Sequence, residues 1–92
     1  MEEKFLAAVE DARKKALTLG VRVRPVTDMQ TACRILSGHR ESDGFYQMVQ
    51  LGHPELTLEA LAVKKQFTGL FTDEQANNAL TRLLDAGYTF RG

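Results

Sequence analysis

The sequence has one cysteine, no tryptophan, two prolines and no excess of either charge in its 92 residues. The single Cys33 excludes an intrachain disulfide, and a lone thiol in a small protein is typical of a reducing compartment. Twelve basic residues balance twelve acidic ones. Non-specific binding of nucleic acid depends on an excess of Lys and Arg, so any binding driven by charge must be local in this chain.

Long apolar runs are lacking too. The stretch "MEEKFLAAVEDARKK" places two acids directly after the methionine, and no apolar segment reaches the length of a signal peptide or a membrane span. We therefore expect a cytoplasmic protein without a membrane partner. A chain of this length is expected to form one domain, residues 1–92, that buries roughly 60 to 65% of its unfolded surface.

Motifs that carry chemistry are the third absence. His39 and His53 are far apart in the chain, and no close pair of His or Cys gives the spacing of a zinc site. The run "HRESDG" holds His, Ser and Asp close together, but a nucleophile and its base normally converge from separate segments. No glycine-rich phosphate loop is present. We expect no catalytic residues, no metal, no cofactor and no small-molecule substrate.

The first feature that is present is an amphipathic helix over residues 2–19. Gly20 follows it at the position of a left-handed C-terminal cap. Apolar residues recur in this helix at spacings of three and four, and they are Phe5, Val9, Ala12, Ala16 and Leu19.

The apolar period changes from about four to two after Gly20. In "VRVRP", Val21 and Val23 alternate with Arg22 and Arg24, and Pro25 limits further pairing, which is typical of a short edge strand. The stretch "YTFR" near the end repeats this alternation. We therefore expect an α+β fold, in which four to five short helices cover a two-stranded antiparallel β-ribbon formed by residues near 21–25 and 88–91.

Capping residues predict the helices between these strands. "TDMQ", from Thr27, reads as a capping box that opens a helix ending near Gly38, and Ser42 is expected to cap a third helix. "ELTLEALAV" fits a strand or a helix; we favour a helix capped by Thr57, because Glu, Ala and Leu are helix formers.

The last third of the chain combines a core-filling turn with a final helix. We expect a short turn around Gly69 whose apolar side chains plug the core, followed by a second capping box from Thr72 to Gln75. The apolar face of the final helix is predicted to contain Ala76, Leu80, Leu83 and Leu84.

Charge is asymmetric along the chain. Residues 12–27 hold five bases and no acid, and pairing of the two expected strands places Arg91 beside them. Arginine forks bind phosphates and carboxylates in two-point contacts. The candidate partner-binding residues are Arg22, Arg24, Arg91, Lys14 and Lys15.

Two other interpretations stay open. In the first, Lys14 and Lys15 pair with Glu10 and Asp11 while the arginines only keep a strand edge from aggregating. In the second, "CRILSGHRESDGFYQMV" forms a helix-turn-helix, although its connection is longer than usual and it offers only glutamines as base readers.

The length and the stretch "MEEKFLAAVEDARKKALTLGVRVRPV" resemble the phage-encoded anti-CRISPR proteins directed at type I-F systems, in particular their eighth group. These groups share no signature, so no residue role follows by motif. The resemblance implies a non-enzymatic inhibitor in the bacterial host cytoplasm. Such an inhibitor binds Cas backbone subunits and guide RNA of the RNA-guided surveillance (Csy) complex and hinders hybridisation of target DNA. The alternative is a small DNA-binding or protein-adaptor domain of a phage or plasmid.

Overall fold

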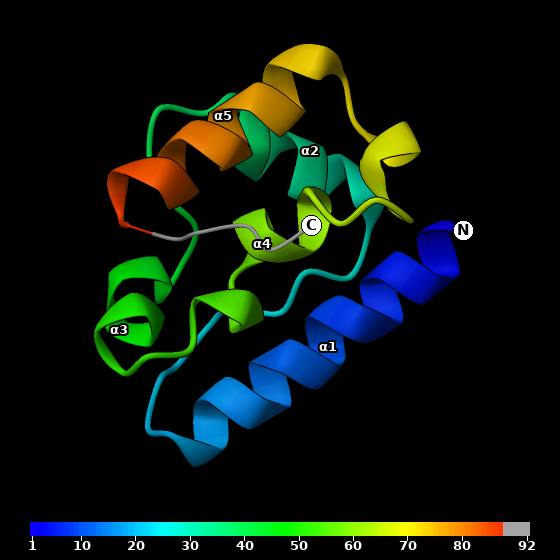
Figure 1. Cartoon of the computed structure of the whole chain (residues 1–92). Coiled ribbons are helices and arrows are strands. Elements are labelled where there is room, and N and C mark those ends of the chain that lie inside the picture. The colour runs from blue at the N-terminus through cyan, green and yellow to red at the C-terminus, as the bar shows by residue number, and fades with distance from the viewer. Residues whose placement is uncertain (88–92) are drawn as a thin grey trace.

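The computed structural model describes residues 1–87, and this part of the chain is all-helical (Figure 1). Helix α4 lies at its centre, with all five residues buried; α1 lies on one side of α4, and α2 and α5 pack together on the other. The elements in chain order are α1 (Glu2–Thr18), α2 (Met29–Ser37), α3 (Phe45–Gln50), η1 (Pro54–Leu56), α4 (Leu58–Ala62), η2 (Thr68–Leu70) and α5 (Asp73–Asp85).

The predicted α+β fold is therefore wrong. Residues near 21–25 run as an extended, non-helical trace between α1 and α2 (Figure 1). They form no strand, because no backbone hydrogen bond joins them to another extended segment within residues 1–87. The expected partner near 88–91 lies outside the described residues. The alternation has another cause: Val21 is buried and Val23 half-buried against Ala16 and Met48 of two helices, while Arg22 and Arg24 face solvent.

Helix α1 ends as its sequence predicts. Gly20 adopts a left-handed conformation with φ +85°. The amide of Val21 then donates to the carbonyl of Ala16 at 2.9 Å, and that of Gly20 to Leu17 at 3.0 Å, which is the Schellman arrangement. This cap turns the chain back and sets the direction in which the extended segment leaves α1.

Two predicted caps are displaced. Asp28, rather than Thr27, caps α2: its carboxylate accepts the Thr31 amide at 2.7 Å, and this bond lowers the pKa of Asp28. Ser42 does not cap α3, which begins after Gly44, because the Ser42 side chain binds Glu59 instead.

The aromatic core forms where the sequence predicts it. The ring of Phe5 meets those of Phe67 and Phe71 edge to face, with centroids 5.2 and 5.1 Å apart. Phe67 and Phe71 flank η2, so the turn around Gly69 fills the core as expected. The stretch "ELTLEALAV", for which we favoured a helix over a strand, contains helix α4. As expected, Thr57 caps it, since its hydroxyl accepts a hydrogen bond from the Ala60 amide at 3.1 Å.

Helix α5 starts with the predicted capping box, but its buried face is rotated from the predicted one. Both bonds of the box are present between Thr72 and Gln75. Leu84 is exposed and Leu80 only half-buried. The buried positions are Ala79, Arg82 and Leu83. The rotation follows from Arg82, whose charge is matched by a buried carboxylate in the centre of the protein.

Candidate functional site

A groove of about 710 Å³ lies between α1, the extended segment 23–26, α2 and residues 38–43 of the loop that follows α2. We call it the arginine groove. Its floor is aliphatic, and its edges carry basic side chains from four different segments. The floor includes Val9, Val26, Met48, Leu58 and Leu61, and the edges carry Arg13, Arg24, Arg34 and Arg40.

The four arginines differ in how far they are neutralised. Arg13 is held by Glu10: its Nε donates to Oε2 at 2.8 Å and its Nη2 donates to Oε1. This pairing lowers the pKa of Glu10 and raises that of Arg13. Arg24 is almost fully exposed, with its Nε 3.8 Å from an Asp43 oxygen. Such exposed pairs contribute little, so Arg24 is only weakly neutralised.

Arg34 and Arg40 complete the edge. Both are exposed, and neither forms an ion pair with any residue between 1 and 87. The only side-chain bond of Arg34 in this part of the chain is a long one, 3.5 Å to the Thr31 hydroxyl. These two guanidinium groups are therefore available to a ligand.

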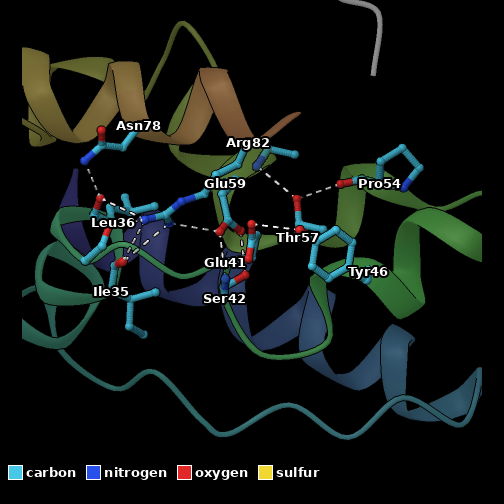
Figure 2. A network of polar contacts seen from close by, with 12 residues as sticks. Ile35, Leu36, Glu41, Ser42, Tyr46, Pro54, Thr57, Glu59, Asn78 and Arg82 are labelled. Carbon is cyan, nitrogen blue, oxygen red and sulfur yellow. Dashed lines mark hydrogen bonds and ion pairs between the residues drawn. The ribbon is translucent and has the colours of Figure 1, made fainter. Parts of the chain in front are cut away.

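A buried polar network holds the loop that carries Arg40 (Figure 2). Glu59 lies at its centre and is fully buried. The Glu59 carboxylate accepts the Ser42 amide at 2.8 Å, the Ser42 hydroxyl, and Nη1 of Arg82 at 3.1 Å. Three donors on one carboxylate offset the cost of burying its charge and fix loop 38–44 against α4.

Helix α5 caps the end of α2 through the same network. Nη2 of Arg82 donates to the carbonyls of Gly38 at 2.5 Å and Leu36 at 3.4 Å. Asn78 also donates to Leu36, at 3.0 Å, and Gln75 donates to the Ser37 hydroxyl at 3.0 Å. The last carbonyls of a helix carry partial negative charge, so a guanidinium at this position is favourable.

The outer end of loop 38–44 is tied to α3. The Tyr46 hydroxyl donates to Glu41 at 2.9 Å. A backbone hydrogen bond and this hydroxyl lower the pKa of Glu41, and the same contact raises the pKa of Tyr46. Loop 38–44 is thus anchored at Glu41, at Ser42 and by the weak contacts of Asp43.

The predicted site residues are only partly brought together. Lys14, Lys15, Arg22 and Arg24 are all exposed, but of these only Arg24 lines the arginine groove. Arg91 lies outside the described residues.

Neither Lys14 nor Lys15 forms an ion pair with a residue of the described part of the chain. Glu10 pairs with Arg13 instead. The alternative in which these lysines are paired along α1 is therefore not what the structure shows.

Sequence analysis missed Arg34, Arg40 and the Glu59–Arg82 pair. The pair left a signal: Glu59 stands in the apolar run "LTLEALA", and Arg82 stands three positions after Ala79 on the face that packs inward. A charged residue on an apolar face indicates a buried partner. No local pattern brings Arg34 and Arg40 together with Arg24, because only the fold does so.

The connection between α2 and α3 is long for a helix-turn-helix motif. Residues 38–44 separate α2 from α3, and α3 is six residues long. Gln47 and Gln50 are exposed on it. This geometry differs from the tight turn and longer recognition helix of that motif.

No protein-family model, curated protein or solved structure matches the chain. None of the helices between residues 1 and 87 combines the length and hydropathy that crossing a bilayer demands. The same residues contain no group of three His, Cys, Asp or Glu side chains placed to hold a metal ion.

Proposed function

We propose that the protein is a non-catalytic inhibitor that binds the type I-F RNA-guided surveillance complex in the bacterial host cytoplasm. It contacts Cas backbone subunits and guide RNA and hinders hybridisation of target DNA. The observation that carries the proposal is the exposure of Arg22 and Arg24 on a tethered extended segment. The sequence resemblance to type I-F anti-CRISPR proteins supplies the identity of the target.

Tethering matters because ordering a flexible segment costs free energy on binding. The extended segment is fixed at both ends, by the buried side chains of Val21 and Val26. Between them, the Arg24 amide donates to Asp43 at 3.3 Å. The arginines are thus presented on a backbone that is already ordered, and they suit phosphate oxygens and carboxylates alike.

Net neutrality supports the same function. With twelve bases and twelve acids, the chain avoids general attraction to cellular nucleic acid, while its local basic surface favours a partner that carries phosphate and acidic groups together. The size of the chain is sufficient, since a standard interface buries about 800 Å² on each partner.

Retention on purified type I-F complex tests the proposal. The wild-type chain is expected to be retained at physiological salt and to reduce hybridisation of target DNA by the complex. Arg22→Glu/Arg24→Glu is expected to weaken retention in a salt-dependent way without changing thermal unfolding. Lys64→Glu/Lys65→Glu is the matched control, with the same change of charge at two other exposed positions.

Two results contradict the proposal. If the wild-type chain is not retained, the surveillance complex is not its target. If Lys64→Glu/Lys65→Glu weakens retention as much as Arg22→Glu/Arg24→Glu does, the extended segment has no specific role in binding. Band shifts of duplex DNA by the protein alone favour the alternative, a small DNA-binding domain, with Gln47 and Gln50 as its exposed base-reading candidates.

A further inference from the structure

We propose that the arginine groove is a docking site for an extended, acidic peptide segment of a partner protein. Carboxylates of this segment meet Arg24, Arg34 and Arg40, and its apolar side chains cover the aliphatic floor. The inference goes beyond the proposed function and holds whichever complex the protein inhibits.

Charge complementarity is the first argument. The groove carries four arginines and two acids, Glu41 and Asp43. Both acids are already engaged, Glu41 by the Tyr46 hydroxyl and Asp43 by the Arg24 amide. The groove therefore has an excess of positive charge, and guanidinium groups bind carboxylates in a planar two-point geometry.

The floor favours a peptide over a nucleic acid. Single-stranded nucleic acids are bound mainly through aromatic side chains on which successive bases stack. No Phe, Tyr or Trp lines the groove, and the lone ring of His39 is the aromatic side chain among its lining residues. Its apolar side chains are aliphatic, from Val26, Ile35 and Leu58 among others. Aliphatic surface next to guanidinium groups fits a peptide in which acidic and aliphatic residues alternate.

The backbone of the groove edge is the third argument. Between Arg22 and Thr27 the described part of the chain makes no backbone–backbone hydrogen bond, and the segment runs as a drawn-out trace outside any helix (Figure 1). The Arg24 amide is held by the Asp43 side chain, so an added strand pairs with the other backbone groups of this edge. Such an edge pairs with an added strand, which then presents alternate side chains to opposite faces. Pro25 has no amide to donate, so it restricts the registers that an added strand can take.

The opposite wall is ordered before binding. Ser42 is held by two hydrogen bonds to the buried Glu59, and Arg40 stands two positions before it. A fixed wall lowers the entropic cost of docking. Both walls of the groove are therefore preorganised, one by buried valines and the other by a buried carboxylate.

Fluorescence anisotropy with a labelled peptide of about eight residues, in which Glu or Asp alternates with Leu or Val, tests the inference. Arg34→Glu/Arg40→Glu is expected to raise the Kd at least about tenfold. The matched control is Lys64→Glu/Lys65→Glu, which makes the same change of charge at exposed positions outside the groove. This control is expected to change the Kd by less than about threefold.

Two further probes separate the contribution of the apolar floor to peptide binding from that of the arginines, and distinguish a peptide site from a nucleic-acid site. A peptide with the same acids and Ser in place of Leu and Val is expected to bind more weakly, because the floor then stays uncovered. An unlabelled single-stranded oligouridylate is expected not to compete with the acidic peptide. Amide chemical shifts of the wild-type protein, followed during titration with the acidic peptide, are expected to change at Val23, Val26 and Arg40 whether or not the charge-reversed variant folds.

Several outcomes overturn the inference. Equal weakening by both variant pairs, or equal affinity for the Ser peptide, shows attraction by charge without a docking groove. Competition by oligouridylate identifies a nucleic-acid site, and competition by unlabelled copies of the protein identifies a self-association surface. Shift changes confined to residues outside the groove place the peptide elsewhere.

Discussion

Glu59 and Arg82 form an ion pair between α4 and α5, with Nη1 3.1 Å from Oε2 and side-chain exposures of 0% and 9%. The pair determines which face of α5 turns inward. It also joins the centre of the protein to the loop that carries Arg40, through the two bonds from Ser42. The stability of the fold and the shape of the groove therefore depend on the same carboxylate.

Arg82→Met is expected to destabilise the protein by about 3 to 5 kcal/mol, because it leaves the buried Glu59 charge uncompensated. Urea unfolding followed by circular dichroism measures the change. Arg40→Met removes an exposed arginine and serves as the control, with an expected effect within about 0.5 kcal/mol. Equal effects of the two substitutions contradict the structural role of Arg82.

The register of α5 is tested by two adjacent leucines. Leu83 is fully buried and Leu84 is 55% exposed. Leu83→Ala is expected to cost about 2 to 5 kcal/mol through the cavity it leaves. Leu84→Ala is expected to cost less than about 0.5 kcal/mol, and the reverse order in urea unfolding shows that the helix is rotated from the described position.

Gly44 combines a left-handed conformation with a close approach. Its φ is +74°, and an added Cβ lies 2.7 Å from Cγ1 of Val21. Gly52 has φ +81° but nothing within 4 Å of such a Cβ. Each substitution to Ala carries a backbone penalty of about 1 to 2 kcal/mol, so the excess cost of Gly44→Ala over Gly52→Ala in thermal unfolding measures the contact with Val21. Equal costs contradict that contact.

The Tyr46–Glu41 bond makes the anchoring of loop 38–44 depend on pH. The lowered pKa of Glu41 means that its contribution to stability is present above the unfolded pKa and is lost as pH falls through the folded one. The raised pKa of Tyr46 gives a contribution that is present below the unfolded pKa and is lost as pH rises through the folded one.

Ultraviolet titration of the phenol, in a Tyr88→Phe background, is expected to give a Tyr46 pKa above the ordinary tyrosine value. Glu41→Gln is expected to return it toward that value, because the charge of the acceptor is removed. Glu55→Gln, at an exposed acid that contacts His53 instead, is the control. An unchanged Tyr46 titration in Glu41→Gln contradicts the bond.

Local patterns predicted most of the helices. The end of α1 at Gly20, the Thr72 capping box and the aromatic turn around Gly69 are all confirmed, because each depends on residues close in the chain. The strand near 21–25 was wrong for a physical reason: a period of two indicates a half-buried extended segment, and helices cover its buried side.

The candidate site was less predictable. Exposure of Arg22 and Arg24 followed from the alternation, since charged residues rarely turn inward. The groove itself combines α1, segment 23–26, α2 and loop 38–43, and its geometry depends on contacts between distant positions. The face of α5 was misjudged because it was predicted from the apolar residues alone, whereas Arg82 is buried with Glu59, a carboxylate in an apolar run, as its partner.

The cap that α5 places on α2 has a kinetic consequence. Gln75 reaches Cys33 across 42 positions, and Arg82 reaches Ile35 across 47. These bonds form only after a long loop has closed, and the entropy of closure opposes them until then. We therefore expect the hydrogen bonds between α5 and α2 to form late in folding. Substitutions that remove these bonds are then expected mainly to accelerate unfolding and to leave the refolding rate almost unchanged.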